Sequence, residues 1–196
     1  MKRLSIAALA ASLLTVFMSA VGAAPPFDVE ALTRLLRATP PGEATFTESR
    51  RVEMLDRTLE SSGRLSFKAP DSFVRETLKP RHEKLAVAGN QVTMSRGEQS
   101  RTVQLDAVPE AAVLVEAIRG TLSGNREALE RLFTIELQGN AGQWSLELTP
   151  RDARLRRQVS TITVGGREGT VREVRLLLAD GDRTLMKIEP MTPAGK

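Results

Sequence analysis

Hydrophobic and polar positions alternate along two long stretches of the chain. From Ala44 to Leu105, and again from Phe133 to Glu189, the chain consists of short segments with apolar side chains at every second position, separated by turn residues. Period-two spacing puts apolar residues on one face of a strand and polar residues on the other. The pattern therefore predicts an antiparallel sheet with one buried and one solvated face. Residues expected to share a face are Leu65 and Phe67, Leu85 and Val87, Val92 and Met94, Val103 and Leu105, and Trp144, Leu146 and Leu148.

Two regions have helical spacing instead. Asp28 can cap a helix that runs to about Ala38. Pro109 suits the first turn of a helix that continues to Thr121, and a shorter helix is expected over Asn125–Leu132. The helix that starts at Pro109 is apolar around most of its circumference. Such a helix either fills the core or touches both the sheet and a ligand, and the pattern leaves these alternatives open.

The predicted elements indicate mainly β structure with α-helices, in a single domain. About eleven strands are expected, with one helical region before the sheet and one inserted midway. A sheet of that length tends to curl, because open twisted sheets rarely exceed about ten strands without doing so. The helical regions are the available cover for its concave face. Turns are predicted at Gly89-Asn90, Gly97-Glu98, Gly165-Gly166 and Asp180-Gly181.

The N-terminus has the three parts of a secretory signal peptide. Met1-Lys2-Arg3 is cationic, Leu4 to Met18 is apolar, and Val21-Gly22-Ala23 supplies small residues for cleavage. The apolar stretch is shorter than the roughly 20 residues that span a bilayer, which favours a cleaved signal over a membrane anchor. We expect residues 1–23 to be removed and residues 24–196 to form one exported domain.

Charge and composition exclude several function classes. The 28 basic and 24 acidic residues give a net charge of +4 and are interleaved, so no nucleic-acid-binding surface is expected. The lack of Cys excludes disulfides and thiolate metal sites, and the single His excludes a His-rich metal cluster. One dense basic segment, from Arg151 to Arg157, is interpreted as a solvated loop. The alternative is a docking patch for an acidic partner or lipid headgroups.

The sequence also lacks recognisable catalytic motifs. It contains no nucleophile elbow, no phosphate-binding glycine loop and no His-Glu-x-x-His. Its one histidine, His82, is expected on the surface rather than as a general base. Asp180-Gly181-Asp182 lacks the further oxygen ligands of a calcium loop and suits a hairpin turn. We therefore expect a protein that is not an enzyme and needs no metal or cofactor.

Several short motifs are informative through their order and spacing. They are Gly63-x-Leu65-x-Phe67-x-x-Pro70-x-x-Phe73, Thr77-x-x-Pro80, Gly89-x-x-Val92-x-Met94, the run from Trp144 to Pro150 that ends in Leu-Thr-Pro, and Gly169-Thr-Val171-x-x-Val174. Together with the signal peptide, this series resembles the LolA family of periplasmic lipoprotein carriers. The resemblance extends over about Asp28 to Glu189, nearly all of the mature chain.

The resemblance implies a fold and a function. Members of that family have an open half-barrel, a single curved antiparallel sheet covered by helices, and so does their outer-membrane acceptor, LolB. They take acylated lipoproteins from an ABC transporter in the inner membrane of Gram-negative bacteria and hand them to that acceptor. The acceptor is lipidated on a Cys, which this chain lacks. The similarity is thus to the soluble periplasmic carrier, which is expected to be a monomer.

The same resemblance implies a hydrophobic cavity closed by a helical lid. Each candidate residue can also be ordinary core, and for Trp144 the core is favoured because Leu146 and Leu148 need the same face. Many family members latch the lid with an Arg just before the Pro of the third-strand turn. That position is Ala69 here, with Lys68 before it as a partial substitute. The candidate cavity and lid residues are Leu65, Phe67, Phe73, Leu85, Met94, Leu114, Ile118 and Trp144.

Other functions stay open beside the lipoprotein carrier. One alternative keeps the fold and changes the cargo, to another lipid or a polyene carried for an export system. A second is a periplasmic regulator that senses lipids or proteins with a similar sheet. Such regulators carry a further C-terminal domain, whereas this chain ends at Lys196, soon after the last predicted strand. A hydrolase is the most distant alternative.

Overall fold

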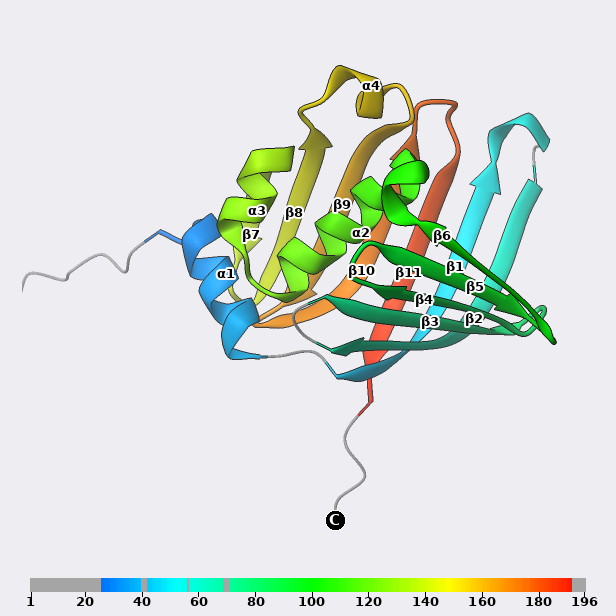
Figure 1. Ribbon diagram of the computed structural model, residues 1–196. Helices are drawn as coiled ribbons and strands as arrows, with labels where there is room; N and C mark the ends of the chain where they lie inside the picture. The colour runs from blue at the N-terminus through cyan, green and yellow to red at the C-terminus, as the bar shows by residue number, and fades with distance from the viewer. Residues whose placement is uncertain (1–25, 40–41, 56, 69–70, 192–196) are drawn as a thin grey trace, which may run out of the picture.

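An eleven-stranded antiparallel sheet curves around three helices in the computed structural model, which describes residues 26–39, 42–55, 57–68 and 71–191 (Figure 1). The predicted signal peptide, residues 1–23, lies outside the described residues. The strand order is β6-β5-β4-β3-β2-β1-β11-β10-β9-β8-β7. The predicted curved and unclosed sheet is therefore confirmed.

The strands form two wings that meet where β1 pairs with β11, with Phe46 opposite Ile188. The first wing contains β1 (Glu43–Val52), β2 (Arg57–Lys68), β3 (Ser72–Lys79), β4 (Glu83–Ala88), β5 (Gln91–Arg96) and β6 (Gln99–Gln104). The second wing contains β7 (Phe133–Asn140), β8 (Gln143–Pro150), β9 (Val159–Arg167), β10 (Thr170–Leu178) and β11 (Arg183–Pro190).

The α-helices are α1 (Val29–Ala38), α2 (Pro109–Leu122), α3 (Arg126–Leu132) and the single turn α4 (Ala153–Arg156). Two short 3-10 helices are η1 (Glu53–Leu55) and η2 (Leu105–Ala107). Helix α1 precedes the sheet, η2, α2 and α3 lie between its two edge strands in the chain, and η1 and α4 lie between neighbouring strands. Asp28 caps α1 by accepting from the Ala31 backbone N–H at 2.8 Å, and Asn125 caps α3 in the same way. The three predicted helices are confirmed. In Figure 1, α2 lies on the concave side between the wings, and α3 lies beside β7 and β8 of the second wing, where Leu129 packs in the first core.

Side chains from the concave face and the helices form two separate hydrophobic cores. The first core fills the second wing and packs Leu32 of α1 and Leu129 of α3 onto β7, β8 and β9. The second core is smaller and lies against the first wing. Its buried members are Val87, Val92, Leu105 and Val115.

One predicted turn is wrong. Gly165 and Gly166 lie inside β9, and the chain reverses at Glu168 and Gly169 instead. A Cβ on Gly166 would come within 2.3 Å of the Trp144 ring, which is buried on the neighbouring strand. Glycine is needed at this position because the indole packs against the backbone. The Gly-Gly pair marks a close approach rather than a turn.

The basic segment after β8 also differs from the predicted loop. Asp152 accepts a hydrogen bond from the Arg154 backbone N–H, and the chain forms the single helical turn α4. Arg151 donates to the backbone oxygens of Glu130 and Phe133, each at 2.9 Å. Arg156 donates to the Pro150 oxygen at 2.9 Å. Two arginines of the cluster therefore hold the turn in place, a role that the spacing of charges did not indicate.

Candidate functional site: the concave face under α2

Helix α2 is shared by both cores. Val113 and Ala117 are buried in the first core, whereas Val115 is buried in the second. These residues lie on opposite sides of the helix, since successive residues are about 100° apart. The apolar circumference seen in the sequence thus has a physical cause: α2 is wedged between two wings of one sheet.

A third stripe of α2 lies between those two sides. Leu114, Ile118 and Leu122 follow one another at helical spacing and are all half-buried. The central strands present Phe46, which is buried, and Ile188, which is half-buried, on the concave face. This stripe and the concave residues of the central strands are the candidate site for an apolar ligand.

The predicted cavity residues of the first wing share its concave face. Leu65 and Phe67 are buried, and Phe73 and Leu85 pack against the second core. Met94 pairs with Leu85 across the strands but is 42% exposed. The apolar surface therefore continues from beneath α2 to an uncovered end at Met94.

Trp144 lies apart from that surface. Its side chain is buried in the first core with Leu146 and Leu148, on the far side of α2 from Leu85. Its indole N–H donates to the Glu168 backbone oxygen at 2.8 Å. These contacts favour the core interpretation of Trp144. Of the eight candidates, Trp144 and Leu114 belong to the first core, Phe73 and Leu85 pack against the second, and the other four belong to neither. The structure does not gather them into one pocket.

A charged group interrupts the apolar concave face near its middle. Arg75 of β3 donates to the Glu48 carboxylate of β1 at 2.9 Å, and Ser61 of β2 lies 3.3 Å from both partners. The Arg75 guanidinium also lies over the Phe46 ring, 4.8 Å from its centroid. Sequence reasoning missed this group, because β1, β2 and β3 bring it together only through their register.

A family comparison identifies the chain. The sequence pattern of the family described as outer membrane lipoprotein carrier protein LolA-like matches residues 21–190. The chain belongs to this LolA-like family. The resemblance inferred from the sequence motifs is therefore confirmed. No curated protein matches the LolA-like chain.

Solved structures similar to this LolA-like chain include proteins of low sequence identity. A LolA superfamily protein from Nitrosomonas europaea is 8% identical, with a TM-score of 0.44 over 84% of this chain and 92% of its own. A putative outer membrane lipoprotein-sorting protein domain from Vibrio parahaemolyticus is 8% identical, with a TM-score of 0.43 over 86% and 96%. A chain of the Pseudomonas aeruginosa MucA/MucB complex is 14% identical, with a TM-score of 0.42 over 85% and 59%.

The LolA-like helix α2 is fastened to the sheet by an arginine of its own. Arg119 donates to the Asp71 backbone oxygen at 2.9 Å through Nη2 and to the Gly89 backbone oxygen with the same nitrogen. Its Nη1 donates to the Glu116 carboxylate at 3.0 Å. Both carbonyls belong to turns of the first wing, so Arg119 joins the helix to two hairpins. Of the expected latch positions, Ala69 lies outside the described residues, and Lys68 is exposed at the end of β2.

Two carboxylates of the LolA-like fold have pKa values below the ordinary range. The hydrogen bond from Arg50, followed by that from the Glu53 backbone N–H, lowers the pKa of Asp182. The hydrogen bond with His82 lowers the pKa of Glu76. His82 is exposed, as predicted, and its ring nitrogen lies 2.9 Å from the Glu76 carboxylate. Both groups stabilise the sheet locally, and neither faces the candidate site.

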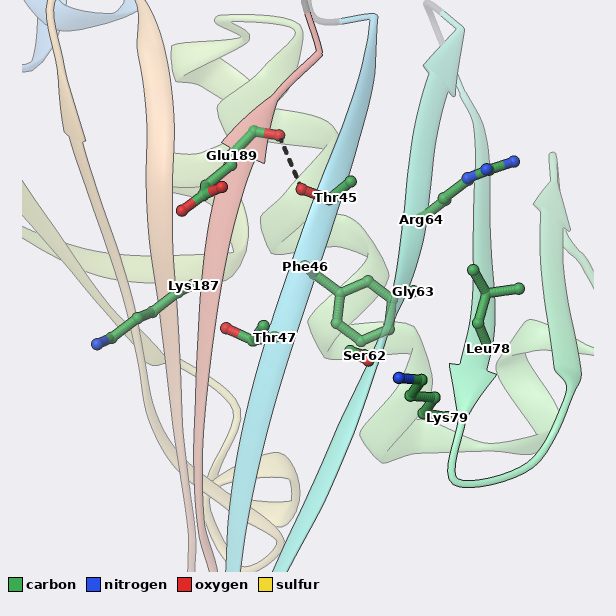
Figure 2. A pocket seen from close by; sticks show the side chains of 10 residues that line it. All are labelled: Thr45, Phe46, Thr47, Ser62, Gly63, Arg64, Leu78, Lys79, Lys187 and Glu189. Atoms are coloured by element: carbon green, nitrogen blue, oxygen red, sulfur yellow. Dashed lines mark hydrogen bonds between the residues drawn. The ribbon is translucent and has the colours of Figure 1, made fainter.

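The outer face of the LolA-like sheet carries a hollow of about 390 Å³ over β1 and β2. Figure 2 shows polar side chains around it, including Thr47, Arg64 and Lys187, and Thr45 bonded to the Glu189 backbone oxygen. It lies beside the register shift between Ser62 and Gly63 in β2. Phe46 and Leu78 also line this hollow, but the charged side chains of Arg64, Lys79, Lys187 and Glu189 surround it, unlike the surface under α2, so we do not assign the ligand to it.

Within the described ranges, no helix is long and apolar enough to cross a bilayer. Among the same residues, no group of three or more His, Cys, Asp or Glu side chains is placed to hold a metal ion.

Proposed function

We propose that this protein is a periplasmic carrier for the acyl chains of lipoproteins. Residues 1–23 direct export and are removed, and residues 24–196 form the working monomer. The carrier receives its cargo from an ABC transporter in the inner membrane and delivers it to an acceptor in the outer membrane. Membership in the LolA-like family supports this assignment.

The observation that carries the proposal is the apolar row that passes beside Arg75 on the concave face. It runs from the buried Phe67 through Phe73 to Val87, and the apolar surface ends on β5 at Met94, which is 42% exposed. On the helix, Leu114 and Ile118 are half-buried, on the stripe between the sides that carry Val113 and Val115. A small movement of α2 away from the central strands would join these parts into one apolar channel open to solvent.

The energetics explain why such a surface is needed. Burying a methylene group contributes about 0.8 kcal/mol, so a C16 chain that leaves a membrane unaided loses on the order of 12 kcal/mol. A lipoprotein with two or three chains would be confined to its bilayer. A soluble protein with an apolar channel offsets most of that loss. It needs helices that open and close and no catalytic group.

The test is native mass spectrometry of protein purified from the periplasm, before and after delipidation. We expect bound acylated species that rebind after removal, with masses that distinguish lipoprotein from free lipid. The carrier function would be contradicted if the purified protein carries no acylated species and binds none when acyl ligands are added. Bound lipid without any lipoprotein would favour the alternative cargo.

Charged substitutions locate the ligand. Met94→Glu and Leu114→Glu are expected to weaken binding of a fluorescent C16 probe, because a carboxylate within an apolar contact is costly. Leu177→Glu is the matched control, since Leu177 is 37% exposed but lies on the outer face of β10. Circular dichroism checks that each variant is folded. If Met94→Glu and Leu114→Glu bind the probe as tightly as the control variant, the ligand does not bind to the concave face.

A further inference from the structure

The ion pair on the concave face has an unused donor. The Arg75 and Glu48 side chains are only 27% and 13% exposed. The Arg75 Nη2 is occupied by Glu48 and Ser61. Its Nε is buried and has no hydrogen-bond partner among the described residues. A buried N–H without an acceptor is costly, and in native proteins such a group commonly binds water or a ligand.

The surroundings of Arg75 are those of an apolar track. Its direct neighbours across the strands are Leu65 on β2 and Leu85 on β4, and Met94 lies next to Leu85 on β5. One row further along, Phe67, Phe73 and Val87 lie on the same face, with Phe73 and Val87 in the second core beneath α2. Arg75 therefore lies at a place where a chain bound along this row would pass.

We propose that Arg75 binds a carbonyl oxygen of the cargo, at the ester or amide that joins an acyl chain to its head group. The inference rests on the proposed function and names the chemistry that the same surface recognises. Glu48 already neutralises the guanidinium, so the free Nε–H suits a neutral acceptor. A free carboxylate would meet repulsion from Glu48. The hydrocarbon chain lies on the apolar row, and its polar end is fixed at Arg75.

A second arginine near the ion pair lies on the opposite face of the sheet. Glu48 lies two residues beyond Phe46 on β1, and Phe46 supports the guanidinium from below. Arg64, on the neighbouring strand, is exposed on the outer face and lines the outer hollow. Arg64 therefore serves as a control, because it is an arginine of the neighbouring strand that lies on the outer face of the sheet.

The experiment compares esters with ethers. Dipalmitoyl phosphatidylcholine and di-O-hexadecyl phosphatidylcholine differ in the two carbonyl groups, and both compete with a fluorescent C16 probe for the purified full chain. We expect wild-type protein to prefer the ester by about tenfold, the size of a charge-assisted hydrogen bond. A dipalmitoyl lipopeptide, measured beside the phospholipid ester, tells which source of the acyl ester binds more tightly.

The variant is the double substitution Arg75→Met with Glu48→Gln, which avoids leaving one buried charge unpaired. It is expected to bind ester and ether equally, with ether affinity close to wild type. Arg64→Met is expected to keep the full preference for ester. If wild type binds both ligands equally, or if the double variant keeps the preference, the carbonyl site is refuted while the carrier function stands. If wild type binds neither ligand, the carrier function itself fails.

Discussion

Arg119 is expected to decide how firmly α2 is held on the sheet. Its side chain is 14% exposed and reaches the carbonyls of Asp71 and Gly89, in two different turns of the first wing. A hydrogen bond from a charged group contributes about 1.5–3 kcal/mol. Arg119→Met removes the donors and keeps most of the apolar stem, so we expect the free energy of unfolding to fall by about 3 kcal/mol.

Two measurements test this expectation. Urea denaturation gives the free energy of unfolding, and hydrogen exchange gives the local opening of α2. The control is Arg126→Met on α3, where the arginine is 46% exposed and pairs with Glu130 at the i,i+4 spacing and with Glu30 of α1 at 3.6 Å. Such surface pairs contribute about 0.3–0.5 kcal/mol. We expect Arg119→Met to raise exchange in α2 selectively.

Acyl-probe uptake connects this contact to function. If the hydrogen bonds of Arg119 hold α2 against the first wing, their removal should speed uptake of a C16 probe by the folded protein. A loss of stability as small as that of the Arg126 control, with unchanged exchange in α2, would refute the reasoning. It would mean that packing of α2 between the two cores fixes the helix without the arginine.

The remaining predictions concern the sheet itself. Gly166→Ala is expected to lower the free energy of unfolding by more than about 2 kcal/mol because its Cβ would meet the buried Trp144 ring, whereas Gly165→Ala, with its nearest contact at 3.7 Å, should cost far less; urea denaturation compares them. Leu148→Ala, in the first core, should cost about 2–5 kcal/mol in the same assay, and a loss below 1 kcal/mol would contradict the assigned core. Asp182→Asn should be less stable than wild type at neutral pH. Because the pKa of Asp182 is lowered by folding, its contribution is present above the ordinary value of 3.8 and lost as pH falls through the lowered value. Thermal unfolding at several pH values should therefore show the difference shrinking in acid, and a constant difference would disprove the assignment.

The sequence by itself determined the local structure of this protein. Period-two spacing predicted the strands, Asp28 and Asn125 marked the helix starts, and the motif series pointed to the LolA family. These signals are local because each depends on residues a few positions apart. The apolar circumference of the helix from Pro109 was also visible, although its meaning was open. Gly165-Gly166 was misread, because glycine serves both tight turns and close packing, and only the neighbouring strand distinguishes the two.

Tertiary structure alone decided how the strands and helices meet. The pairing of β1 with β11 placed Phe46 beside Ile188, although these residues are far apart in the chain. Register across three strands brought Glu48, Ser61 and Arg75 together on a face that each strand's pattern described only in part. The contacts of Arg119 could not be predicted either, because its acceptors are backbone carbonyls, which every residue type has. The cause in each case is physical: contacts across a curved sheet depend on register and curvature, and residues distant in sequence set both.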